Sequence, residues 1–362
     1  MLFSEYIGKG HIDMVCDTIA EEIYAYCIHE DPDARVAIEV SATSEIILIF
    51  GELTINEEVE RIPYEDIVDE ILAKAMYTKE YYDPTIVWDV KTQSPNIAQR
   101  VDEGEYIGFG DTNVAYGRAV NYSMEFMPIE YLIARECVEI LEDYAISNPN
   151  TITFDTKVMV AYDETKQEII DIFIACQCLN KSAKRLPIYD MLERELNNSG
   201  YDVSKKNIRI DFYEREGRIS DSGTTGRKTA VNCYGIMGKM DGGSLNGKDL
   251  TKGDKIGKFI ARYIAVNIIC ADLCNDIEVY VHCTMGAIWP TIEVVADKNT
   301  ELIDKVVQKV FGKKRLNYYM HKFASYRVDA NIKGYFGKMS GRPWEVGDKL
   351  GEIWEVLEEL KC

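Results

Sequence analysis

The sequence lacks the marks of a zinc-binding, disulfide-rich or membrane-spanning protein. Its four histidines are widely scattered, and its ten cysteines form no CxxC pair and lie mostly in apolar segments. This pattern predicts buried free thiols rather than disulfides or zinc sites. No run of about 18 apolar residues is present, so a membrane-spanning helix is not expected. The start, MLFSEYIGKGH, lacks the layout of a signal peptide, and we therefore expect a cytoplasmic protein.

Basic residues are scarce relative to acidic ones. The chain has 41 Lys and Arg against 61 Asp and Glu, a formal net charge of −20. A surface of this charge repels nucleic acid and anionic membranes, so neither is expected as a partner. The segment 221–262 is the exception, because it holds eight basic and four acidic residues. That segment is either a solvated surface with chance clustering or a binding site for a compact, highly charged anion.

Three units of similar pattern follow one another at a spacing of about 120 residues. Each consists of an amphipathic helix and then two β-rich runs. The helices are expected at 12–27, 128–144 and 256–270, and the strand pairs at 35–42 with 45–50, 157–162 with 169–176, and 277–283 with 291–295. The spacing predicts an α+β fold of three similar domains with mixed or antiparallel sheets in a pseudo-threefold arrangement. The expected domains are 1–102, 103–218 and 219–362, and discontinuous boundaries stay open.

The glycine-rich stretch 221–255, DSGTTGRKTAVNCYGIMGKMDGGSLNGKDLTKGDK, favours the anion site. Its glycines let the backbone turn sharply and approach a ligand. Four cations suited to phosphate oxygens stand between them: Arg227, Lys228, Lys248 and Lys252. Asp221 and Asp254 flank these cations and suit Mg²⁺. The spacing GxxxxGK at 242–248 imitates a P-loop, but Asp249 stands where a P-loop needs Ser or Thr.

Acidic residues and a histidine mark the first unit. In GKGHIDMVCD (residues 8–17), His11 and Asp13 lie where the first helix begins. A helix N-terminus attracts anions, although Asp is also an ordinary N-cap. Glu39 interrupts an apolar strand, and Glu52 follows an apolar run. A carboxylate inside an apolar sheet requires a hydrogen bond, an ion pair or a cation, unless strand alternation turns it to solvent.

These motifs, taken in order from about residue 4 to residue 349, resemble those of S-adenosylmethionine synthetases. GHIDMVCD is similar to the family's GHPDK motif, and ARVAIEV (34–40) with GELT (51–54) to its acid-bearing strand pair. SPNIAQRVD (94–102) and GFGDTN (108–113) resemble the gating loop and the acidic segment after it. DSGTTGRK (221–228), GGSLNGKDLTKGD (242–254) and GYFGKMSGRPWE (334–345) resemble DxGxTGRK, GGGxxxGKDxxKxD and GHFGR…PWE.

The resemblance implies a methionine adenosyltransferase of one-carbon metabolism. In this family the methionine sulfur attacks C5′ of ATP, and the released triphosphate is hydrolysed to pyrophosphate and phosphate. It further implies two Mg²⁺ ions and K⁺ at each site, and a homodimer or dimer of dimers with the active sites between subunits. Two alternatives stay open: a related transferase for another nucleoside triphosphate or thioether, and a non-catalytic nucleotide-binding regulatory paralogue.

The resemblance also implies roles for individual residues. His11, Arg227, Lys248 and Lys252 would be catalytic, with His11 assisting departure of the triphosphate. The ATP site would comprise His11, Lys157, Asp221, Arg227, Lys228, Ser244 and Lys248. The methionine site would comprise Glu52, Gln99, Asp111, Asp221 and Lys252. Asp13 and Asp254 would bind Mg²⁺, and Glu39 would bind K⁺.

The sequence departs from the family pattern in three places. Met14 stands where GHPDK has its lysine, and Lys9 or Lys239 is a conceivable replacement for that charge. The GGP-containing loop expected before Asp221 is missing, so Phe212 or Tyr213 would have to supply its aromatic ring. HCTMG (282–286) replaces an SYAIG-like strand. We therefore expect the triphosphate site to be better kept than the adenosine and methionine sites.

Overall fold

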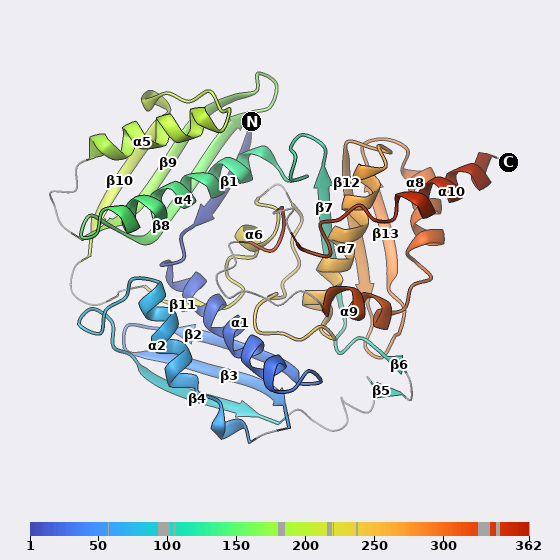
Figure 1. The fold of residues 1–362 in the computed structure, drawn as a ribbon, viewed down its shortest axis with the longest axis horizontal. Helices are drawn as coiled ribbons and strands as arrows, with labels where there is room; N and C mark the ends of the chain where they lie inside the picture. The colour runs from blue at the N-terminus through green and yellow to red at the C-terminus, as the bar shows by residue number, and fades with distance from the viewer. Residues whose placement is uncertain are drawn as a thin grey trace.

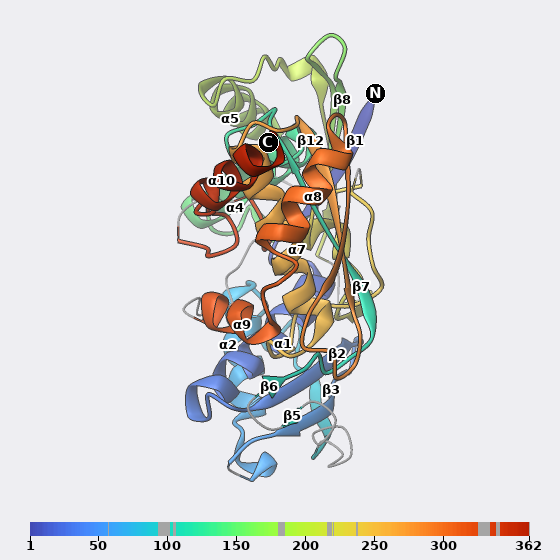
Figure 2. The same cartoon turned by 90° about the vertical axis from the view of Figure 1, so that its right-hand side faces the viewer.

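The structure is a computed structural model that describes residues 1–56, 58–92, 102–103, 106–179, 185–215, 219, 221–236, 238–324, 334–337 and 341–361. It has an α+β fold in which three sheets, each with its own helices, surround a central segment that contains the short helix α6 (Thr229–Asn232) (Figure 1). In the view turned by 90°, strands β1, β7 and β8 lie toward one side of the molecule and helices α5, α9 and α10 toward the other (Figure 2). None of the helices in the described ranges is long and apolar enough to cross a membrane.

The first sheet has the strand order β11-β2-β3-β4. Its elements are α1 (Ile12–Glu30), β2 (Arg35–Ala42), β3 (Ile46–Thr54), α2 (Tyr64–Lys74), β4 (Thr85–Lys91) and β11 (Gly223–Thr224), with a 3-10 turn at Val59–Arg61. β2 and β3 form an antiparallel hairpin, whereas β4 runs parallel to β3 after the crossover helix α2. The far strand β11 pairs antiparallel with β2. It therefore carries the start of the glycine-rich stretch into this sheet.

The second sheet repeats this plan with the order β1-β8-β9-β10. Its elements are β1 (Leu2–Ile7), α4 (Ile129–Ser147), β8 (Ile152–Asp163), β9 (Glu168–Cys178), α5 (Arg185–Asn198) and β10 (Ile208–Glu214), with a 3-10 turn at Lys205–Asn207. β8 and β9 are antiparallel, β10 is parallel to β9, and β1 pairs antiparallel with β8.

The third sheet has the order β13-β12-β7. Its elements are β7 (Asn113–Val120), α7 (Gly253–Cys270), β12 (Asp276–Cys283), β13 (Thr291–Ala296), α8 (Thr300–Val310), α9 (Leu316–Ala324) and α10 (Leu350–Lys361). All its pairings are antiparallel. A separate two-stranded sheet joins β5 (Asp102–Glu103) and β6 (Tyr106–Ile107).

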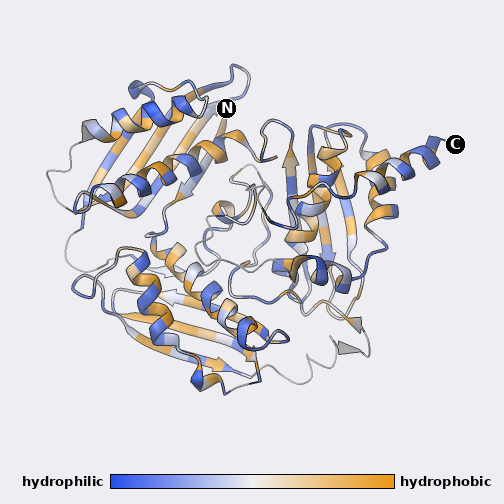
Figure 3. Ribbon diagram, viewed as in Figure 1, coloured by the Kyte–Doolittle hydropathy of each residue, from blue (hydrophilic) through white to orange (hydrophobic). Residues whose placement is uncertain are grey.

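The three predicted helix–hairpin units are confirmed, because α1, α4 and α7 each precede a hairpin of antiparallel strands. The strand periodicity has a simple cause. Residues of β2 and β12 alternate between half-buried and buried, because successive strand side chains point to opposite faces of the sheet. Hydrophobic residues are frequent in the strands of the three sheets (Figure 3). The strand pairings cross the ranges 1–102, 103–218 and 219–362, since β1 pairs with β8 and β11 with β2. The domain boundaries themselves stay a prediction.

The molecule has two hydrophobic cores that meet at the start of α1. One core belongs to the first sheet, and the other is shared by the second and third sheets. Ile12 and Val15 pack into the first core, whereas Met14 packs into the second. The N-terminus of α1 is therefore held between the units rather than within one of them.

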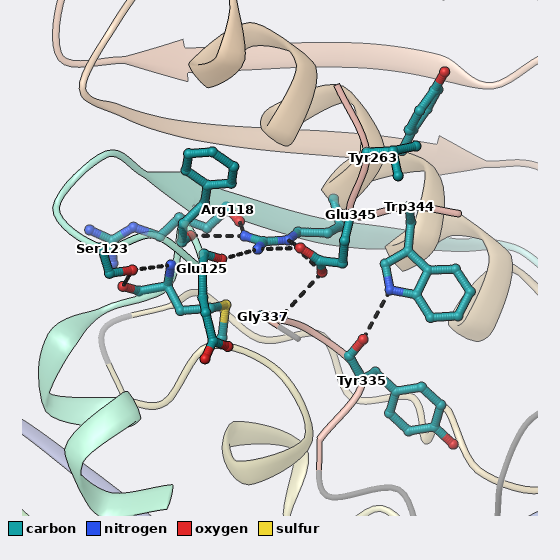
Figure 4. A network of polar contacts seen from close by, with 12 residues as sticks. Arg118, Ser123, Glu125, Tyr263, Tyr335, Gly337, Trp344 and Glu345 are labelled. Atoms are coloured by element: carbon teal, nitrogen blue, oxygen red, sulfur yellow. Dashed lines mark hydrogen bonds and ion pairs between the residues drawn. The ribbon is translucent and has the colours of Figure 1, made fainter. Parts of the chain in front are cut away.

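The motif at 334–345 anchors the C-terminal part of the chain (Figure 4). The Trp344 ring stacks on Phe259 of α7 with centroids 3.8 Å apart, and the buried Glu345 accepts bonds of 2.9 and 2.6 Å from Arg262. The remaining Arg262 donors reach the carbonyl oxygens of Arg118, Glu125 and Phe126. A fully hydrogen-bonded buried pair of this kind is costly to break, so this motif fixes α7 against β7.

Candidate active site

The glycine-rich stretch contributes to two helix N-termini. α1 begins at Ile12 with His11 as its N-cap, and α7 begins at Gly253 with Lys252 as its N-cap. Each helix has one aspartate in its first turn, Asp13 in α1 and Asp254 in α7. The free N–H groups and the dipoles of both helices favour negative charge here.

Asp13 is the centre of the first half of the site. This carboxylate is 1% exposed and accepts a 2.6 Å bond from the ammonium of Lys228. It also accepts a 2.9 Å bond from the backbone N–H of Thr224, and Arg227 Nε lies 3.4 Å away. β11 brings these residues together, because a Cβ at Gly223 would lie 2.6 Å from the Ile12 carbonyl oxygen. Only glycine allows this close approach of β11 to α1.

Asp254 is the centre of the second half. It accepts a 2.6 Å bond from Lys248 Nζ and a 2.7 Å bond from Asn113 Nδ2. The Lys248 segment runs beside β2, since Gly247 O accepts from Ile38 N at 2.8 Å and Lys248 forms a bridge with Ala37. Gly243 is also required, because a Cβ there would lie 2.0 Å from the Asp254 carboxylate.

Glu39 joins the two halves. Its carboxylate accepts a hydrogen bond from the Thr225 hydroxyl and lies 3.8 Å from Lys248 Nζ. The sequence left open whether Glu39 turns to solvent or has a partner. The structure shows that its carboxylate has both a hydrogen-bond donor and a cation.

His11 is neutral at physiological pH. Burial lowers its pKa to about 4, and the nearby positive charge of Lys228 acts in the same direction. Its Nδ1 accepts a 3.2 Å bond from the backbone N–H of Asp13. The proton of the neutral ring is therefore assigned to Nε2. This side chain can donate a hydrogen bond to an anion.

The segment 221–262 does not act as one anion site. Three of its eight cations are buried in ion pairs of the scaffold: Lys255 with Glu21, Lys258 with Asp241, and Arg262 with Glu345. Lys239 pairs with Glu278 at 2.9 Å on the third sheet. Four cations remain around the two aspartates: Arg227, Lys228, Lys248 and Lys252.

The other predicted residues are placed by contacts of their own. Lys157 and Asp221 act electrostatically on His11, and Lys157 forms a 2.7 Å ion pair with Glu5. The buried Ser244 accepts from Asn246 N at 3.1 Å and lies against Gly226. Glu52 is opposite Ala37, the residue that bridges to Lys248.

Asp111 is exposed, and the preceding Gly110 donates its N–H to the Thr251 carbonyl, next to the buried Lys252. Gln99 lies outside the described residues, and so does most of the segment 94–102.

Neither suggested replacement for the missing family lysine lies at the site. The Lys9 ammonium stands 4.1 Å from the Phe154 ring centroid and 3.6 Å from Glu142, and Lys239 is held by the third sheet. Met14 itself is 5% exposed and belongs to the larger core. This position is therefore an apolar packing position, because its side chain is part of the core.

Sequence reasoning missed Asn113 and Asp17. Asn113 ends the quoted GFGDTN motif and binds Asp254, but its neutral side chain offered no charge signal. Asp17 is buried and accepts bonds from Gly226 N at 2.9 Å and Asn232 Nδ2 at 2.8 Å. Its place one helical turn after Asp13 was the available signal. Asp17 therefore positions the loop that carries Arg227 and Lys228.

No group of three or more His, Cys, Asp or Glu side chains that could hold a metal ion occurs within the described part of the chain. Asp13 and Asp254 each face a lysine instead, and each offers hard carboxylate oxygens. A single carboxylate suits Mg²⁺ that is bound together with substrate phosphates and water. The donor chemistry of both aspartates therefore fits such an ion.

Comparisons with known proteins point to one family along the chain. Family models described as S-adenosylmethionine synthetase, N-terminal domain and C-terminal domain, match residues 1–95 and 216–346. The S-adenosylmethionine synthase of Mycoplasmopsis pulmonis is 31% identical and covers 97% of both chains, and that of Clostridium tetani is 28% identical over 98% of both. A solved structure, an unusual S-adenosylmethionine synthetase from Campylobacter jejuni, has a TM-score of 0.81 at 25% identity, covering 98% of this chain and 99% of that one.

Proposed function

The chain belongs to the S-adenosylmethionine synthetase family, and on that premise we propose that it transfers the adenosyl group of ATP to methionine. The methionine sulfur attacks C5′ of ATP and forms an S–C5′ bond. The C5′–O bond breaks, and its electrons leave with the triphosphate. Water then divides the triphosphate into pyrophosphate and phosphate. Because the sulfur is a neutral nucleophile that needs no general base, the main task is to stabilise charge on the leaving oxygen.

Two lysine–aspartate pairs at two helix N-termini carry this proposal. Each lysine is held 2.6 Å from its aspartate, so both cations are already in place. A polyphosphate offers each lysine a new anionic partner, and the helix N-termini stabilise its remaining charge. The site thus exchanges internal ion pairs for phosphate contacts, and a polyanion is the ligand class that fits it.

The residue roles follow from these contacts and from the family resemblance. His11 donates from Nε2 toward the leaving oxygen, while Arg227, Lys248 and Lys252 stabilise the developing charge. Lys157, Asp221, Lys228 and Ser244 complete the ATP site. Glu52, Gln99, Asp111, Asp221 and Lys252 form the methionine site. Orientation of sulfur and C5′ by these groups supplies much of the remaining rate enhancement.

Asp13 and Asp254 are proposed to hold two Mg²⁺ ions with the polyphosphate, and Glu39 to hold K⁺. When bound, the divalent ions neutralise phosphate charge. Arrival of phosphate draws Lys228 and Lys248 away from the aspartates, which leaves carboxylate oxygens available. We further propose a cytoplasmic homodimer or dimer of dimers with active sites between subunits.

One observation favours a second candidate, a transferase for another nucleoside triphosphate or thioether. Met14 is buried where the family motif has a lysine, and Lys9 and Lys239 are engaged elsewhere. A charged hydrogen bond contributes roughly 1.5–3 kcal/mol, so its loss changes how one phosphate is held. The regulatory, non-catalytic candidate is weaker, because a scaffold has no need of this set of cations and carboxylates.

The test is direct. Purified protein is incubated with ATP, methionine, Mg²⁺ and K⁺, and S-adenosylmethionine, pyrophosphate and phosphate are measured by mass spectrometry. We expect all three products in equal amounts, and at least about a hundredfold slower formation with Lys248→Ala. Absence of product at high enzyme concentration would refute the proposal. Product from another triphosphate or thioether alone would establish the second candidate.

A further inference from the structure

A pocket lies where the second and third sheets meet, and no residue of the candidate active site lines it. It has a volume of about 580 Å³, within the range of small-molecule sites. Its apolar wall includes Leu2 at the start of β1, Val120 at the end of β7, and Pro128 before α4. Tyr122 and Tyr162 add aromatic surface. The pocket lies close to the N-terminal end of β1, because Leu2 lines it; Figure 1 marks this end of the chain.

Glu130 in the first turn of α4 is an incompletely paired group in the wall of this pocket. The residue is 1% exposed, and its Oε2 has no hydrogen-bond partner in the described ranges. A buried carboxylate oxygen without a donor is energetically unfavourable, so such groups call for an explanation. Burial raises the pKa of Glu130, although its own backbone N–H and the positive charge of Arg118 partly oppose this rise.

The charge of the pocket is not balanced by its own residues. Arg118 is engaged by Asp276 through two bonds of 3.0 and 2.6 Å. Once this pair is set aside, Glu130 and Glu164 leave two negative charges in the lining. A ligand with two positive charges would balance them.

The surroundings favour an organic cation over a metal ion. The volume is far larger than an ion requires, and aliphatic and tyrosine side chains form much of the wall. Hard cations need six or more oxygen ligands, and the described residues provide no cluster of three potential metal ligands. Tyrosine faces and carboxylates together are well suited to alkylammonium groups.

We propose that this pocket binds an aliphatic diammonium ion, with one ammonium on Glu130 Oε2 and the other toward Glu164. The methylene chain between the two amines packs against the apolar wall. This inference does not depend on the adenosyltransferase proposal, because no residue of the two sites is shared.

The test is calorimetric titration of the full-length protein with 1,4-diaminobutane at pH 8, compared with 1-aminobutane. We expect saturable binding of the diamine and weaker binding of the monoamine. Glu130→Gln should weaken diamine binding at least about tenfold, because a charged hydrogen bond is lost. Asp143→Asn, an exposed charge removal on the same helix, is the matched control and should bind as the wild type does.

Glu164→Gln provides a second variant on an exposed hairpin, where folding is not at risk. It should weaken binding of the diamine but leave binding of the monoamine nearly unchanged. Equal diamine affinity in Glu130→Gln and in wild type would overturn the proposal, as would the absence of saturable diamine binding at millimolar concentrations. The diamine should also raise the thermal unfolding temperature more than potassium chloride does at the same ionic strength. An equal rise with both would overturn the proposal, because an organic cation would then not be required.

Discussion

The two halves of the candidate active site are built alike but are supported differently. In both, an aspartate in the first turn of a helix accepts a 2.6 Å bond from a lysine of the glycine-rich stretch. Asp13 has in addition a backbone N–H and the guanidinium of Arg227, whereas Asp254 has the amide of Asn113. Asp13 is 1% exposed and Asp254 is 8% exposed.

The two aspartates therefore differ in what they still contact when their lysine is removed. Without Lys228, Asp13 still faces Arg227 and the Thr224 N–H. Without Lys248, Asp254 and Glu39 both lose the same cation. The Asp13 half is therefore the more rigid, and the Asp254 half is the more sensitive to loss of its lysine.

The largest effect is expected on turnover. Lys248→Ala should lower kcat by about 10²–10³-fold, the range for loss of one donor to a transition-state charge. Lys228→Ala should lower it less, because Arg227 remains. Rates of S-adenosylmethionine formation are measured under saturating substrates, and circular dichroism checks folding. Equal losses in the two variants would mean that the halves are not supported differently.

Asp17 should impose a pH dependence of stability on the first half. Burial raises its pKa to about 7 from an ordinary 3.8, so the folded state holds a proton more tightly than the unfolded state. Its contribution is therefore most favourable below about pH 4 and is lost as the pH rises to about 7. The shift corresponds to roughly 4 kcal/mol.

The Asp17→Asn variant lacks this titrating group. Urea unfolding at several pH values measures the difference in unfolding free energy between the wild type and this variant. The stability of the wild type relative to Asp17→Asn should fall between pH 4 and 7. A constant difference across that range would contradict the assignment.

Replacing each aspartate by asparagine shows how much each half contributes to the free energy of unfolding. Asp13→Asn should destabilise the fold by about 3 kcal/mol, because it leaves the poorly exposed Lys228 without its partner. Asp254→Asn should have a smaller effect, since its pair is closer to solvent. Asp221→Asn, at an exposed position, is the control and should change stability by less than about 0.5 kcal/mol. The ordering is checked by chemical denaturation, and the reverse ordering would refute it.

Only a small stability effect is expected for His11→Asn, because asparagine is also a good N-cap. The change in unfolding free energy should stay below about 1 kcal/mol at pH 8, while turnover falls. His11 has a pKa of about 4 when folded and 6.5 otherwise. Its contribution to stability is therefore complete above pH 6.5 and declines as the pH falls to about 4. That decline should be absent in His11→Asn, and its persistence would assign it to another group.

Local sequence determined much of this fold. Apolar periodicity predicted α1, α4, α7 and the hairpins that follow them, because side-chain spacing along one element reports its own buried face. The ordered motifs likewise predicted a family that the comparisons confirm. The roles of the individual site residues stay predictions, and the one for Gln99 lies outside the described residues.

Tertiary structure alone decided which strands complete each sheet and which charges reach the site. β11, β1 and β7 each pair antiparallel with the first strand of a hairpin from a distant part of the chain. The eight cations of segment 221–262 look equivalent in sequence, yet Lys255, Lys258 and Arg262 are buried in scaffold ion pairs. Charge type is local information, whereas burial and partner depend on contacts made by folding, such as that between Lys255 and Glu21, which are 234 residues apart. Sequence therefore predicted a polyphosphate site, and only folding showed which of its cations face the two aspartates.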